Sequence, residues 1–259
     1  MPQCLLEGGL AEIQDRVRSA PSVSLFLSFD GALTGLVEDP EDAGLAQATR
    51  DVLEVLSKRP DILTVILSGR ALSDLERRAG ISGVVYAGNH GLEIGGRGLR
   101  FVEPFAAART DILARISDSL AANLKGVFGV RVEYKGLTTS VHYRQASAAD
   151  FQDIERIVQA IVAPGVSPFC VDVGKMALEV IPRTDWHTGA AVCWINSRLA
   201  GKGAACIYVG DDRSDEAAFQ RLPDEITVCV GNPEWSSARY YLSDPAEVRE
   251  FLVWLNQSR

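Results

Sequence analysis

Apolar runs alternate with helix-like stretches along the first third of the chain, and this alternation limits the possible folds more than any other feature. The runs VSLFLSF (23–29), ILTVIL (62–67) and GVVYAG (83–88) are separated by helical patterns near 45–58 and 71–79. Strands that are apolar on both faces and are joined by amphipathic helices are typical of a parallel sheet covered on both sides. We therefore predict an α/β core for this segment.

The pattern changes from about residue 97 and returns after Pro182. The middle segment predicts two helices, 105–123 and one through Ile154–Ile161, and strands at 130–136, 137–144 and 175–181. The last segment predicts helix 188–200, strand 205–210, a helix from Ser214, strand 226–231 and helix 244–255. Neither α/β segment has enough strands for a sheet of its own. We predict a doubly wound, mostly parallel α/β core of Rossmann type, residues 1–96 and 182–259, with an inserted α+β cap at 97–181.

Composition excludes several classes of partner. The formal net charge of -8 argues against nucleic acid or an anionic membrane, because both require a basic face. The five cysteines show no metal-ligand spacing, and we expect buried thiols in a reducing compartment. The N-terminal stretch lacks a basic start followed by an apolar segment, so we expect no secretory signal. No apolar run approaches the roughly 20 residues that span a bilayer. We expect a cytoplasmic protein with a small-molecule ligand; the sequence indicates no particular protein partner.

Polar residues gather where the predicted parallel strands end. In an open parallel sheet, ligands bind beyond the carboxyl ends of the strands. The candidates at these ends are Ser28, Asp30, Gly31, Ser68, Gly69, Arg70, Asn89, His90, Asp211, Asp212, Asp215 and Glu216. Converging carboxylates repel each other without a cation, so Asp30, Asp211, Asp212 and Asp215 suggest Mg²⁺. Ser68 and Gly69 precede a helix and are suited to an anion.

Each of these motifs also has an interpretation without chemistry. The stretch GDDRSDE is equally well explained as a solvated acidic loop with Ser214 capping a helix. LSGR is common turn chemistry, and a single histidine in GNHG is more often hydrogen-bonded than catalytic. These three motifs and the segment Ser28–Gly31 all lie at strand ends, and this joint occurrence favours a functional site.

The combination resembles the haloacid dehalogenase superfamily of phosphohydrolases and, within it, the trehalose-6-phosphate phosphatases. The matching stretches run in family order from residue 23: LFLSFDGALTGLVEDP, VILSGRALSDL, YAGNHGLEI, VEYKGLTTSVHYR, ALEVIPRTDWHTGAAV, YVGDDRSDEAAF and YYLSDPAEVREFLVWL. The resemblance implies a Mg²⁺-dependent phosphatase in which a first-motif aspartate attacks phosphorus and a second acts as general acid and base. Asp30 matches the second aspartate.

Two catalytic positions depart from the pattern that the resemblance implies. Ser28 stands at the nucleophile position, and Thr188 stands where a lysine is expected beside the phosphate; Ala32 also replaces a threonine. A serine hydroxyl is a poor nucleophile near neutral pH unless a base activates it, and loss of the lysine removes a positive charge from an electrostatically stabilised transition state. Rescue would require charge on His187, or activation of Ser28 or water by Asp30. We expect weakened Mg²⁺ binding, because a charged oxygen ligand is missing.

The middle segment keeps the residues that the resemblance assigns to the sugar. These are Glu133, Lys135, His142, Arg144 and Glu179, and Gly69, Arg70, Asn89 and His90 complete the expected substrate contacts. Without the resemblance, EYK on an alternating strand is most often a solvated face. With it, we favour a sugar-hydroxyl site formed when the cap closes. Two hypotheses remain: a pseudophosphatase that retains a pocket for trehalose-6-phosphate or a related sugar phosphate, and an active Mg²⁺-dependent phosphatase with an unusual nucleophile.

Overall fold

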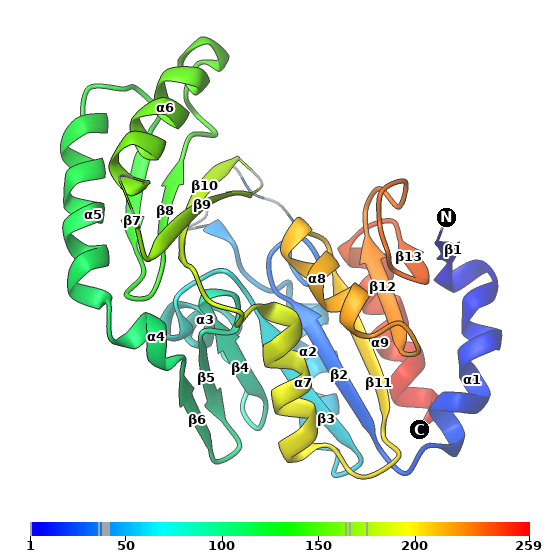
Figure 1. The fold of residues 1–259 in the computed structure, drawn as a ribbon. Coiled ribbons are helices and arrows are strands. Elements are labelled where there is room, and N and C mark those ends of the chain that lie inside the picture. Colours follow the sequence, from blue (N-terminus) through cyan, green and yellow to red (C-terminus); the bar gives the residue numbers. More distant parts are fainter. Residues whose placement is uncertain (1, 36, 38–41, 164, 166, 175) are drawn as a thin grey trace. The chain divides into compact units, whose positions relative to one another are not determined.

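The computed structural model describes residues 2–35, 37, 42–163, 165, 167–174 and 176–259. Lys175, which begins the predicted strand 175–181, and the part of LFLSFDGALTGLVEDP at 36 and 38–40 lie outside these residues. The chain divides into two compact units, Met1–Phe101 with Trp186–Arg259 and Val102–Asp185 (Figure 1). In the described residues, no helix is both long and apolar enough to cross a bilayer.

The larger unit is built on one mixed sheet. Its neighbours from one edge to the other are β1 (Gln3–Cys4), β13 (Tyr240–Leu242), β12 (Ile226–Val230), β11 (Ala205–Gly210), β2 (Val23–Ser28), β3 (Ile62–Leu67), β4 (Val85–Gly88), β5 (Glu93–Gly96) and β6 (Leu99–Val102). All pairs from β1 to β4 are parallel, and β5 is antiparallel to β4. This confirms the predicted mostly parallel α/β core. Strands β1, β5, β6 and β13 lie where the sequence pattern predicts none.

Helices cover both faces of this sheet, because successive strand side chains point to opposite sides. Leu25 and Leu27 of β2 belong to the core on one side, and Phe26 belongs to the core on the other. The first side is covered by α1 (Leu10–Ser19), α2 (Gln47–Ser57), α3 (Leu72–Ala79) and α9 (Pro245–Ser258). The second side is covered by α7 (Thr188–Leu199) and α8 (Arg213–Arg221). The sheet is therefore doubly wound, as predicted.

The smaller unit is an α+β layer. Its antiparallel sheet has the order β7 (Arg131–Tyr134), β8 (Thr139–His142), β10 (Ala177–Pro182) and β9 (Phe169–Gly174). One core joins this sheet to α5 (Thr110–Leu124) and α6 (Phe151–Val162). The predicted helix 105–123 is two helices, since α4 (Pro104–Ala107) precedes α5. Strand β9 was absent from the sequence prediction.

The burial of the cysteines differs from the expectation, and two tryptophans pack on one phenylalanine. Cys206 and Cys229 are buried, but Cys193 is exposed and Cys4 and Cys170 are half-buried, so the expectation of five buried thiols is wrong. Cys193 is exposed because it lies on α7 outside the row of Ala191, Val192 and Ile195 that faces the sheet. Trp186 and Trp194 pack on Phe101, with ring centroids 4.5 and 4.9 Å away, and serve as packing residues.

Candidate active site

The first site segment follows β2, the central strand of the larger sheet. Ser28 is the last residue of β2 and is half-buried. It pairs with Leu67 of β3 in the sheet. The turn after it requires Gly31, which has a φ of +81°. A Cβ on Gly31 would lie 1.8 Å from a carboxylate oxygen of Asp211, so that carboxylate packs directly on the turn. The ends of β2 and β11 therefore bring Ser28, Asp30 and Asp211 to one place, as the sequence predicts.

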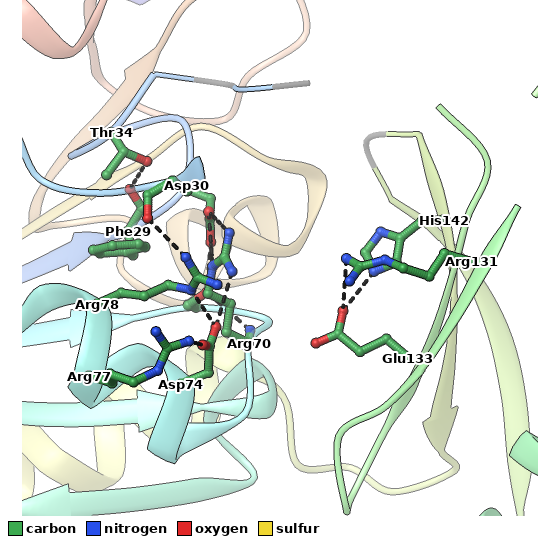
Figure 2. A network of polar contacts seen from close by, with 12 residues as sticks. Phe29, Asp30, Thr34, Arg70, Asp74, Arg77, Arg78, Arg131, Glu133 and His142 are labelled. Atoms are coloured by element: carbon green, nitrogen blue, oxygen red, sulfur yellow. Dashed lines mark hydrogen bonds and ion pairs between the residues drawn. The ribbon is translucent and has the colours of Figure 1, made fainter. Parts of the chain in front are cut away.

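Asp30 is held by Arg70 from the next strand end (Figure 2) and by a serine of the same segment. The Arg70 Nε donates to Asp30 Oδ1 at 3.1 Å and Oδ2 at 2.9 Å, and Nη2 donates to Oδ1 at 2.8 Å. The Ser68 hydroxyl donates to Asp30 Oδ2 at 3.0 Å. Both carboxylate oxygens of Asp30 therefore accept charge-assisted or hydroxyl hydrogen bonds, which are the strong kind in proteins.

A second carboxylate, Asp74, fixes Arg70 from the other side. Arg70 Nη1 donates to Asp74 Oδ2 at 3.1 Å, and Asp74 also pairs with Arg78 at 2.7 Å and with Arg77. Burial lowers the pKa of Arg70, but its hydrogen bonds and ion pairs with Asp30 and Asp74 outweigh this and raise it. Burial raises the pKa of Asp74, but the hydrogen bonds and ion pairs with Arg78 and Arg70 outweigh this and lower it below the usual range. Arg70 and Asp74 are therefore both charged at neutral pH.

The turn after β4 carries two further predicted residues in an unusual backbone conformation. Asn89 and His90 have φ angles of 48° and 57°, in the left-handed region that few non-glycine residues occupy. Their N–H groups donate to the carbonyls of Arg70 at 2.6 Å and Ser68 at 3.0 Å. The His90 ring lies where a side chain on Gly69 would be, 2.6 Å from the position of its Cβ. The turn is thereby fastened to the Ser68–Arg70 segment.

Thr188 is the first residue of α7, and its side chain is uncharged. Its buried hydroxyl donates to the His90 carbonyl at 3.5 Å. His187 caps the same helix, because its Nδ1 accepts the Gly189 N–H at 3.1 Å. A ring nitrogen that accepts a hydrogen bond has no proton, so His187 in this geometry is a neutral imidazole rather than a cation. The suggested rescue of the missing lysine by His187 is therefore not supported.

The acidic motif after β11 is divided between two tasks. Asp212 caps α8 and Asp215 completes a capping box, so the alternative in which Ser214 is the cap is wrong. Asp215 accepts the N–H groups of Asp211 at 2.8 Å and Asp212 at 3.0 Å. The Tyr208 hydroxyl donates to Asp215 at 2.6 Å. Asp215 thus holds the backbone that carries Asp211.

Asp215 predicts a pH dependence of stability. Burial raises its pKa from 3.8 to about 6, against the hydrogen bonds from Tyr208 and the two backbone N–H groups. The folded chain then keeps a proton that the unfolded chain has already released, so this residue's contribution is fully present below the unfolded pKa and is lost as pH rises through about 6. We expect the free energy of unfolding, measured in urea, to fall relative to Asp215→Asn between about pH 4 and about pH 7. A constant difference between the two proteins would contradict this.

The predicted Mg²⁺ ligands do not form a metal site here. Among the described residues, no three His, Cys, Asp or Glu side chains are arranged to hold a metal ion. Asp30 is bound by Arg70, and Asp212 and Asp215 accept backbone N–H groups at the start of α8. Mg²⁺ needs near-octahedral oxygen ligands, and Ser28 supplies no charge. The donor set does not fit the ion in this geometry, and a Mg²⁺ site remains a prediction of the sequence.

The smaller unit holds a separate polar cluster on the sheet face opposite α5 and α6. Glu179 accepts hydrogen bonds from Lys135 Nζ at 3.0 Å and from the Ser140 hydroxyl at 2.7 and 2.9 Å. Glu133 and His142 Nε2 lie 2.7 Å apart, with Arg131 at 3.8 Å from the same carboxylate (Figure 2).

The register of the paired strands brings the side chains of this polar cluster together. Glu133 is opposite Ser140, and Ser140 is opposite Glu179. The hydrogen bond from His142 lowers the pKa of Glu133 despite burial, which raises it, and Lys135 and Arg131 lower it further. Arg144 follows the end of β8 and is half-buried. The fully solvated interpretation of EYK is wrong for Lys135, which is 8% exposed.

Three contributors were missed in the sequence. Asp74 lies four residues after Arg70, the spacing of a helical ion pair, so the pattern RALSD contains a usable signal. Ser140 has no signal except its register on β8. Tyr208 is a fully buried tyrosine whose hydroxyl needs a partner, and the acidic motif just after it offers one.

Comparison with solved structures defines the class of protein. The C-terminal domain of Candida albicans trehalose-6-phosphate phosphatase superposes with a TM-score of 0.84 at 21% identity, covering 99% of this chain and 98% of that chain. The C-terminal domain of the Candida albicans trehalose synthase regulatory protein superposes with a TM-score of 0.72 at 15% identity, covering 95% and 97%. The chain therefore shares the fold of these two domains.

Sequence comparison identifies the family within that class. The family model for trehalose-phosphatase matches residues 26–245, and the chain belongs to this family. Trehalose-phosphate phosphatase of Mycobacterium tuberculosis is 34% identical over 260 residues, which cover 97% of this chain. The match covers 64% of the mycobacterial protein, so the chain spans less than two thirds of that relative. The resemblance found in the sequence is confirmed at the level of the family.

Proposed function

We propose that this chain binds a phosphorylated sugar, trehalose-6-phosphate or a close relative, and does not release phosphate from it. The observation that carries the proposal is the state of Asp30. Both of its carboxylate oxygens accept hydrogen bonds from Arg70 or Ser68, so it is poorly placed to take a proton from Ser28 or from water. Ser28 thus has neither a carboxylate of its own nor an available base in Asp30.

The smaller unit supplies the proposed sugar specificity. Carboxylates, an amine and an imidazole on one sheet face provide the donors and acceptors that hydroxyl groups require. Glu179 is ordered by Lys135 and Ser140, and Glu133 is ordered by His142, so little side-chain entropy is lost when hydroxyls bind. In this proposal the smaller unit, predicted as a cap at 97–181, recognises the sugar hydroxyls.

The second candidate is an active Mg²⁺-dependent phosphatase. It is favoured by the retained Asp30, Ser68 and Asp211 near Ser28 and by the name of the mycobacterial relatives. The fold does not decide between the two, because one solved neighbour is called a phosphatase and another a regulatory protein. In both cases we expect a cytoplasmic protein with weakened Mg²⁺ affinity.

Phosphate release separates the candidates. The purified chain with trehalose-6-phosphate and excess Mg²⁺ is expected to release no phosphate above the rate of a heat-denatured sample, while calorimetry detects binding of the same ester. Multiple turnovers that require Mg²⁺ would support the second candidate instead.

Glu179→Gln tests the sugar site. The change keeps the shape but weakens the bonds to Lys135 and Ser140, so we expect about tenfold weaker binding of trehalose-6-phosphate. Binding of inorganic phosphate should be unchanged, because that probe has no sugar. Asp172→Asn is the matched control, since Asp172 is opposite Glu179 in the register of β9 and β10 and has none of the cluster's contacts among the hydrogen bonds of the described residues. Equal losses for both probes would argue against a sugar role.

A further inference from the structure

Arg70 takes the place in the larger unit where a cation is needed beside Asp30. We infer that the chain binds phosphate, as a phosphomonoester or as the inorganic anion, through the Arg70 guanidinium and without a divalent metal ion. The inference rests on the proposed function, and it adds the means by which the phosphate is held. It departs from the metal dependence that the family resemblance implies.

The Arg70 guanidinium is fixed on both carboxylate oxygens of Asp30. Arg70 makes three contacts of 2.8 to 3.1 Å with the two oxygens of Asp30, and its side chain is 13% exposed. A metal ion on these oxygens would have to displace the guanidinium, and Ser28 offers no charged ligand in return. The backbone N–H of Arg70 also donates to Ser68 Oγ at 3.1 Å, which fixes the segment Ser68–Arg70. Arg70 is therefore a pre-positioned cation.

More arginines than carboxylates gather around Asp74. Three arginines, Arg70, Arg77 and Arg78, share two carboxylates, Asp30 and Asp74. Within these ion pairs, three positive and two negative charges leave one positive charge in excess; the Asp211 carboxylate, which packs on Gly31, is not part of this count. Because Arg77 and Arg78 both pair with Asp74, Arg70 can exchange part of its pairing for a phosphate oxygen without leaving Asp74 uncompensated. A planar guanidinium is well suited to that exchange, since it binds phosphate through two N–H groups at once.

Two carboxylates of the acidic motif after β11 already have partners in the backbone. Asp212 and Asp215 accept N–H groups at the first turn of α8, where the helix dipole favours negative charge. Their carboxylate oxygens are thus already engaged by N–H groups. Asp211 is the acidic side chain of this motif that packs against Gly31, in the turn after β2. One carboxylate is a weak basis for Mg²⁺ binding.

Calorimetric titration of inorganic phosphate, which cannot be hydrolysed, tests the inference. With the unmodified chain, the affinity in EDTA should be within about twofold of the affinity in excess Mg²⁺. Arg70→Gln should weaken binding by about tenfold or more, and Arg70→Lys should lose less, because it keeps the charge but not the planar pair of donors. Thermal unfolding of each variant shows whether it is folded.

Arg59→Gln is the matched control. Arg59 also pairs through two nitrogens with an aspartate, Asp61, but at the opposite end of β3, and its removal should leave phosphate affinity unchanged. Binding that is lost in EDTA and restored by Mg²⁺ would overturn the inference, and so would no binding under either condition. Release of phosphate from trehalose-6-phosphate would overturn the proposed function instead, and it would leave these titrations as they are.

Discussion

The double variant Ser28→Asp, Thr188→Lys is expected to release phosphate from trehalose-6-phosphate at least about 10³-fold faster than the unmodified chain. The aspartate supplies a carboxylate that can attack phosphorus and bind Mg²⁺, and the lysine supplies fixed positive charge at the start of α7. The two changes also cancel in charge, so the local electrostatic balance is kept. Phosphate release at equal protein concentration is the measurement.

The control for this gain is Ser28→Asn, Thr188→Lys. Asparagine has nearly the size of aspartate but cannot form an acyl phosphate, so this variant should stay inactive. If the unmodified chain is as active as the aspartate variant, the active-phosphatase candidate is correct. If neither protein releases phosphate, the site has changed its ligand or its chemistry, and the proposed sugar phosphate is wrong.

Gly31→Ala is expected to lower the free energy of unfolding by at least about 2 kcal/mol. Gly31 has a φ of +81°, which an alanine adopts only with strain, and its new Cβ would collide with the Asp211 carboxylate. Gly35→Ala is the control in the same loop, since no atom of the described residues, its chain neighbours aside, lies within 4 Å of a Cβ there and its φ is not in the left-handed region. Urea unfolding measures both. Equal stability of the two variants would show that Asp211 does not pack on this turn.

The sequence predicts the larger unit well because its strands are buried on both faces. Uninterrupted apolar runs such as 62–67 and 205–210 coincide with β3 and β11, and the helix predicted at 188–200 coincides with α7. Where burial is less complete, the pattern is weaker. Strand β13 has three residues, too few to show a period, and β9 mixes exposed and half-buried positions.

The site was predictable in position but not in its pairings. Strand ends placed Asp30, Ser68, Arg70 and Asp211 in one region, because parallel strands end at the same edge. The ion pair between Asp30 and Arg70 depends on side-chain geometry across two loops, which spacing does not encode. The same holds for Asp215, whose carboxylate turns to Tyr208 and the backbone and not to a shared cation.

Phosphorus-31 NMR of the unmodified chain, mixed with an equal amount of trehalose-6-phosphate in excess Mg²⁺, tests the central claim most directly. One spectrum reads both binding and cleavage of the ester. We predict that the ester resonance broadens or shifts on binding and keeps its full intensity over hours. Growth of an inorganic phosphate resonance at the expense of the ester would contradict the account.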